Sequence, residues 1–167
     1  GLSGNANANR FGAGGWFDNG NTVGGNTLAE AVTGNSFIEF TVTPNAGYEL
    51  SLTSFVFNWD RSGTGPNTLT LRSSADNYVL NLGTVAALPA SLTTGNTLSI
   101  SGLSSFTTAT TFRLYGYGAS ATAGAGGFDV ATNIVNVQLN GTAVPEPTVA
   151  SLLVLGVGFA GLRRRRR

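Results

Sequence analysis

Apolar and polar side chains alternate along several short segments of the chain, and this two-residue period constrains the fold more than any other feature. The clearest case is IEFTVT at 38–43, and similar alternation occurs at 68–72, 111–117 and 134–140. Successive side chains of a β-strand point to opposite faces, so each segment predicts a strand with one buried face. Clusters of Gly, Asn, Ser and Pro separate these segments and predict turns.

About eight short strands with no helical period before residue 144 predict an all-β domain. The spacing favours an antiparallel β-sandwich, jelly-roll-like, over residues 1–143. Within 48–61 the apolar residues are even-numbered up to Leu52 and odd-numbered from Phe55. One regular strand cannot place both sets on the same face, so a bulge or a short turn near Thr53 is expected.

Weaker patterns give further expectations. Glycines and asparagines predict a loop or an irregular strand at 1–25, and composition predicts a flexible loop at 116–127. A short strand or turn is expected at 28–32. Strands are expected at 78–82, with Leu80 and Leu82 facing inward, and at 98–100.

The chain ends in three parts that follow one another in a fixed order. First come Val144 and the motif Pro145, Glu146 and Pro147. Residues 148–162, with the sequence TVASLLVLGVGFAGL, carry no charge. Five basic residues complete the chain: Arg163, Arg164, Arg165, Arg166 and Arg167.

The uncharged run 148–162 predicts one short transmembrane helix. As a helix these 15 residues would extend about 22 Å, against a hydrocarbon core of roughly 30 Å. Snorkelling arginines and local thinning of the bilayer can cover part of the difference. A core helix of this length would show a polar face, and this run has none. The arginine cluster resists translocation, so it should act as a cytoplasmic stop that leaves residues 1–143 outside.

Residues 144–167 resemble the PEP-CTERM sorting signal of Gram-negative bacteria. The resemblance consists of VPEP, an apolar run with glycines and a terminal arginine cluster. Pro145, Glu146 and Pro147 match the motif of that family residue by residue. The resemblance implies an exosortase as the partner, with processing near 145–147. It also implies an inner-membrane-anchored precursor with a periplasmic domain and a cytoplasmic C-terminus. The mature form is expected at the cell surface or outside the cell, and a signal peptide is expected upstream of Gly1.

Residues 4–141 also resemble a domain that recurs ahead of PEP-CTERM signals, through FTVTPNAGYELSLTSFVFNW, RSGTGPNTLTLRSS, FRLYGYGAS and a terminal NVQLNG. Many such domains end in a strand similar to FRIDNVTLNG. Here FDVATNIVNVQLNG contains an apparent insertion at 131–133, so the role of an aspartate in that strand does not transfer simply to Asp129.

Composition limits the chemistry of the domain. Histidine and cysteine are absent, which excludes Ser-His-Asp and Cys-His catalysis and a His-ligated zinc site. Residues 1–143 contain four arginines and seven acidic residues, a formal charge of −3 without a basic stripe, so no nucleic acid partner is expected. A paired-carboxylate hydrolase stays open in principle, but no spacing selects a pair. A structural calcium ion also stays open. We expect a non-enzymatic protein without a cofactor or a catalytic metal.

The alternative hypothesis is a carbohydrate-binding β-sandwich that acts on exopolysaccharide. Aromatic rings can stack on sugars, and Trp16, Trp59, Tyr115 and Tyr117 are the candidates. Trp59 follows Phe55 and Phe57 at period two, which favours the core. Tyr115 and Tyr117 share a predicted strand face with Arg113 and are the better ligand-binding candidates, although cross-strand contacts within the sheet are the more common role.

Overall fold

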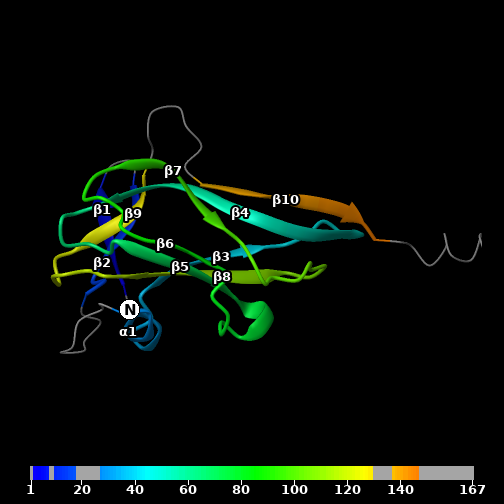
Figure 1. Cartoon of the computed structure of the whole chain (residues 1–167), viewed down its shortest axis with the longest axis horizontal. Coiled ribbons are helices and arrows are strands. Elements are labelled where there is room, and N and C mark those ends of the chain that lie inside the picture. The colour runs from blue at the N-terminus through cyan, green and yellow to red at the C-terminus, as the bar shows by residue number, and fades with distance from the viewer. Residues whose placement is uncertain (1, 8–9, 18–26, 130–136, 147–167) are drawn as a thin grey trace, which may run out of the picture.

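The structure is a computed structural model that describes residues 2–7, 10–17, 27–129 and 137–146. Two antiparallel sheets face each other across an apolar core, which confirms the predicted all-β sandwich (Figure 1). The predicted transmembrane helix at 148–162 lies outside the described residues. Within the described ranges, none of the helices has the length and apolar character needed to cross a membrane.

The larger sheet is built around β4 (Tyr48–Arg61). Its strand order is β1-β2-β9-β4-β10, and β7 pairs with the other edge of β4. The bounds of the remaining strands are β1 Ser3–Asn7, β2 Arg10–Gly14, β7 Thr93–Ser99, β9 Ala125–Asp129 and β10 Val137–Pro145.

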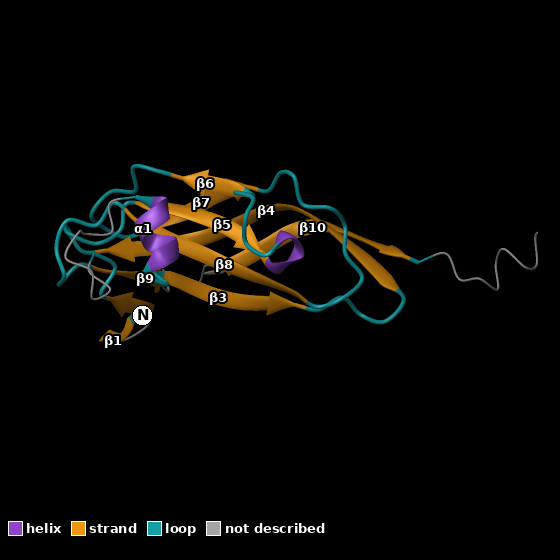
Figure 2. Ribbon diagram, turned by 90° about the horizontal axis from the view of Figure 1, so that it is seen from below, coloured by secondary structure: helices purple, strands orange, loops and turns teal. Residues whose placement is uncertain are grey.

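The smaller sheet has the order β3-β8-β5-β6. Its strands are β3 Phe37–Val42, β8 Thr110–Tyr117, β5 Thr68–Ser73 and β6 Gly83–Val85. The helix α1 (Leu28–Thr33) and a 3-10 helix (Ser74–Asp76) lie at two ends of the outer face of this sheet (Figure 2).

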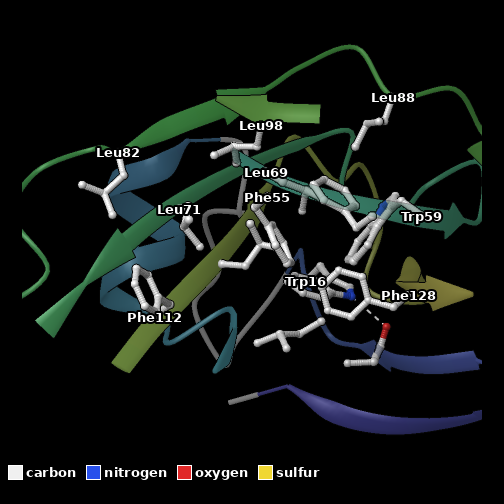
Figure 3. Close-up of a cluster of buried hydrophobic side chains, with 14 of the residues drawn as sticks. Trp16, Phe55, Trp59, Leu69, Leu71, Leu82, Leu88, Leu98, Phe112 and Phe128 are labelled. Carbon is white, nitrogen blue, oxygen red and sulfur yellow. Dashed lines mark hydrogen bonds between the residues drawn. The ribbon is translucent and has the colours of Figure 1, made fainter. Parts of the chain in front are cut away.

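The core between the sheets is rich in aromatic side chains (Figure 3). Trp59 and Phe55 of β4 are fully buried, as is Phe112 of β8 from the opposite sheet. Trp16, which follows β2, is also fully buried, and its ring meets that of Trp59 edge-on with centroids 5.9 Å apart. The prediction that Trp59 belongs to the core is confirmed.

The predicted bulge lies on β4 at Thr53. Asn140 of β10 pairs with Ser54, and the next residue, Gly141, pairs with Leu52, so Thr53 has no partner in this ladder. The Thr53 hydroxyl donates to the carbonyl of Asn140, which holds the extra residue in place. The bulge lets the odd-numbered aromatic residues of β4 and its even-numbered leucines turn toward the same core.

Three expectations are corrected. Residues 28–33 form helix α1, which starts with a capping box: the Glu30 amide donates to the Thr27 hydroxyl, and the Glu30 carboxylate accepts from the Thr27 amide. Residues 78–82 form no strand, because Asn77 and Tyr78 adopt positive φ and reverse the chain. As a result Leu80 is 45% exposed, and only Leu82 faces inward.

The third correction concerns the glycine-rich segment at 116–127, where a strand, β9, begins at Ala125. A Cβ at Gly127 would lie 2.3 Å from the backbone of Gly12, and one at Gly126 would lie 2.8 Å from the Trp59 ring. Glycine is therefore needed here for close contact with β2 and with the core, and not for a turn.

Candidate functional site

The first candidate site is the C-terminal end of β10, which carries the start of the sorting motif. β10 pairs with β4 from Val137↔Phe57 to Pro145↔Tyr48. Beyond the strand, the Glu146 amide donates to the carbonyl of Gly47 at 2.8 Å. Pro145 and Glu146 therefore continue the ladder of the sheet, with no spacer between the domain and the motif.

Pro145 is tolerated in this ladder because of its position. In an antiparallel pair, hydrogen-bonded and non-hydrogen-bonded positions alternate. The bond from Glu146 to Gly47 places Pro145 opposite Tyr48 at a non-hydrogen-bonded position, where an N–H would point away from β4. The proline therefore removes no ladder bond, and it lies on an edge strand, where a proline is tolerated.

β9 and β10 lie along the same edge of β4, one after the other. Phe128 of β9 pairs with Trp59, and Val137 of β10 pairs with Phe57, so a single β4 residue, Asn58, separates the two ladders. Residues 130–136, which include the insertion expected at 131–133, are outside the described ranges. The insertion thus falls between the end of β9 and the start of β10. Asp129, the last residue of β9, lies opposite Arg10 of β2.

The remaining parts of the sorting signal lie outside the described residues. These parts are Pro147, the apolar run at 148–162 and the basic cluster Arg163, Arg164, Arg165, Arg166 and Arg167.

The second candidate site is the outer face of the smaller sheet, where Arg113 is held on three sides. Its Nε lies 2.8 Å from Oε2 of Glu39 on β3, and its guanidinium lies 4.3 Å from the Phe37 ring centroid and 3.9 Å from that of Tyr78. The bond to Glu39 raises the pKa of Arg113, although partial burial acts in the opposite direction. Arg113 is therefore a permanent, well-positioned cation.

The two predicted tyrosines differ in exposure. Tyr115 is only 2% exposed, because its ring packs edge-on against Phe37 and lies under the Arg72 guanidinium. Its flat face is not free to stack on a sugar. Tyr117 is half-buried, and its hydroxyl lies 3.1 Å from that of Thr70. Trp16 and Trp59, the other aromatic candidates, are fully buried.

Arg72 of β5 also belongs to this candidate site, although no sequence pattern indicated it. It pairs directly with Arg113 across β5 and β8, although like charges in opposite positions disfavour a sheet. Its Nε donates to the Asn81 side chain at 2.7 Å, and its Nη1 donates to the carbonyl of Tyr78 at 2.9 Å. Arg113 is paired with the Glu39 carboxylate, whereas Arg72 makes its hydrogen bonds to uncharged groups. The register that brings them together cannot be read from the sequence.

The other arginines of the described domain hold the fold together. Arg10 forms an ion pair with Asp60 at 2.9 Å. Arg61 donates to the carbonyls of Leu88, Ser62, Gly63 and Gly65. Arg72 and Arg113 are therefore the two arginines of the described part that lie together on a sheet face.

The described carboxylates are spread over the fold and serve local contacts. Glu30 caps α1, Asp76 accepts from the backbone amides of Val79 and Leu80, and Glu49 accepts from the Ser105 hydroxyl. Among the residues that the structure describes, no three His, Cys, Asp or Glu side chains are grouped to hold a metal ion.

Comparison with known proteins identifies the C-terminal segment. Residues 143–167 match the family model of the PEP-CTERM protein-sorting motif. No curated protein and no solved structure matches the chain. The predicted sorting signal is thereby confirmed. The motif supports sorting through an exosortase and implies a membrane-anchored precursor that is later exported to the cell surface.

Proposed function

From the PEP-CTERM sorting motif that the chain carries, we propose that this is an exported, non-enzymatic protein of the cell surface or extracellular matrix. Residues 148–162 hold the precursor in the inner membrane as a helix, and the five arginines keep the C-terminus cytoplasmic. The β-sandwich is then presented on the periplasmic side until an exosortase acts near Pro145-Glu146-Pro147. The match over 143–167 is the single observation that carries this proposal.

Two features of the domain support a non-catalytic role. Cysteine and histidine, the residues of the common nucleophilic triads, are absent from the sequence. The carboxylates of Glu39 and Asp60 are paired with arginines. Those of Asp76 and Glu49 accept hydrogen bonds from a backbone amide and from a hydroxyl group. This arrangement suits a stable scaffold at the cell surface.

The localisation of two variants tests the proposal. A chain that ends at Glu146 keeps the complete described domain but loses the apolar run and the arginines. We expect it to be released as a periplasmic protein, while the full chain passes through a membrane-bound precursor. Membrane fractionation followed by immunoblotting measures this difference. The matched control substitutes only Glu146 with Gln, which should keep the membrane precursor and impair its processing. Identical localisation of all three chains would contradict the sorting role.

A second candidate function is supported by the paired arginines of the outer face. Arg72 and Arg113 are cross-strand neighbours in a domain of negative net charge. Arg113 is paired with Glu39, whereas Arg72 is bonded to uncharged groups. Guanidinium groups bind carboxylates through paired hydrogen bonds, and the neighbouring Tyr78 and Tyr117 could contact sugar rings. We propose that this face binds an acidic polysaccharide, such as a uronic acid polymer, in the surrounding matrix.

Affinity electrophoresis in gels that contain alginate or neutral dextran tests this second function. Arg113→Gln should reduce retardation by alginate, whereas Glu39→Gln should increase it, because it removes the competing carboxylate. Tyr117→Phe tests the contribution of the hydroxyl with little change in packing. Equal mobility of all variants in both gels would exclude polysaccharide binding by this face.

A further inference from the structure

The last described residues of the chain meet the start of β4 at one tip of the larger sheet. This ribbon tip consists of the turn and first residue of β4, 44–48, together with 144–146. Figure 1 shows that it lies at the opposite end of the sandwich from the β1–β2 hairpin. On the other side of β4, Leu50 and Phe106 exchange two backbone hydrogen bonds of 2.9 Å each. The ribbon tip is therefore fixed to the domain on both edges of β4.

The distance between the ribbon tip and the expected membrane segment is short. The Glu146 amide is hydrogen-bonded to the Gly47 carbonyl, and the apolar run begins two residues later at Thr148. Two extended residues span at most about 7 Å. The headgroup layer of one leaflet is about 5–7.5 Å thick, since a bilayer of 40–45 Å has a hydrocarbon core of about 30 Å. A domain with a longer linker could stand clear of the membrane, but this one cannot.

We propose that the ribbon tip is a membrane-contact surface that lies among the lipid headgroups of the outer leaflet while the precursor is anchored. The inference rests on the proposed membrane helix at 148–162. It adds that the folded domain itself, and not only its tail, touches the bilayer. The exosortase then meets its motif at the end of a β-ribbon whose tip touches the membrane surface.

The exposed side chains of the ribbon tip fit a headgroup layer. Tyr48 is 41% exposed and Val144 is 54% exposed, and they occupy neighbouring rungs of the β4–β10 ladder. Tyrosine is enriched at membrane interfaces because its ring is apolar and its hydroxyl stays hydrated. The turn PNAG at 44–47 carries no charge. Two carboxylates lie at this end of the sandwich: that of Glu146 is exposed, and that of Glu49 accepts a hydrogen bond from the Ser105 hydroxyl.

Site-specific labelling measures this contact directly, because the chain contains no cysteine. The variant Ala46→Cys places a fluorescent label in the exposed turn of the ribbon tip. Gly63→Cys is the matched control: a side chain there has no atom within 4 Å, and it lies beyond the far end of β4. The 14 residues of β4 separate the two positions by about 40 Å. Both full-length variants are reconstituted into vesicles of phosphatidylethanolamine and phosphatidylglycerol with a quencher attached to the lipid headgroups.

We expect several-fold stronger quenching of the label at position 46 than of the label at position 63. Co-flotation with the vesicles is measured on the same samples. Equal quenching at the two positions in protein that floats would overturn the contact surface and leave the membrane anchor intact. Protein that fails to float would overturn the proposed anchor and the contact surface together.

Discussion

Trp16, which follows the N-terminal hairpin, is the largest side chain that this region places in the core. Its ring is fully buried against Trp59, and its Nε1 donates to the carbonyl of Ala13 at 2.7 Å. Replacing it with alanine removes a large apolar side chain, leaves a cavity and leaves the Ala13 carbonyl without this donor. We expect Trp16→Ala to lower the free energy of unfolding by about 3–5 kcal/mol, measured by urea denaturation. Phe11→Ala is the control, since Phe11 is 70% exposed and its loss should change stability little.

Gly116 of β8 lies against the same tryptophan. A Cβ at this position would come within 2.5 Å of the Trp16 ring and 3.2 Å of Pro66, so the ring would have to move within a filled core. Gly116→Ala should therefore destabilise the protein by about 1–3 kcal/mol, the usual cost of overpacking. Gly63→Ala adds the same methyl group in open space, and thermal unfolding should show no loss of stability for it. Equal melting temperatures for both variants would contradict the packing of Trp16 against β8.

For individual aromatic residues, the sequence pattern predicted burial correctly in one case and failed to predict it in another. Trp59 was assigned correctly to the core, since it continues the period-two pattern of Phe55 and Phe57. Tyr115 was expected on an open face, yet it is buried by side chains from the two neighbouring strands. Strand neighbours depend on sheet order and register, and a single sequence does not state either of them. The pairing of Arg72 with Arg113 escaped prediction for the same reason.

Among the secondary-structure elements, β10 is the one on which the link between domain and tail depends. It covers the edge of β4 from Tyr48 to Phe57 with backbone pairs. A chain that ends at Glu146 retains this ladder, whereas one that ends at Asn136 exposes that edge of β4. We expect the first to stay monomeric and the second to lose stability and to associate through the exposed edge. Urea denaturation and light scattering measure the two effects, and similar behaviour of both truncated chains would show that β10 is dispensable.

The elements themselves were predictable where the side-chain pattern alone decides the structure. The alternation at 38–43 gave β3, and the change of phase in 48–61 gave the bulge at Thr53. β9 was missed because its glycines, which normally indicate a loop, are required for close contact with Gly12 and Trp59. Helix α1 was missed because six residues are too few to establish a helical period; only its capping box, Thr27 with Glu30, marked it.

On the scale of the whole molecule, the sorting signal was predictable because its three parts are contiguous in sequence. Its attachment to the fold was not predictable. The pattern ended the last strand at Asn140, but β10 continues to Pro145, at the end of the ladder with β4. This difference removes any flexible spacer between the domain and the motif. In the proposed anchored precursor, the distance of the domain from the membrane is therefore set by the β-sheet and not by a linker.

A spacer inserted between Val144 and Pro145 tests this consequence on the intact chain. A flexible linker of about twelve glycine and serine residues has an average end-to-end distance of about 20 Å, which exceeds the thickness of the headgroup layer. The motif and the tail stay intact, so flotation with vesicles should be unchanged. The quenching of a label at position 46 by headgroup-attached quencher should fall to the level seen at position 63. If quenching at position 46 persists with the spacer, the ribbon tip binds lipid through its own side chains, Tyr48 and Val144, and the short connection is not what holds it at the membrane.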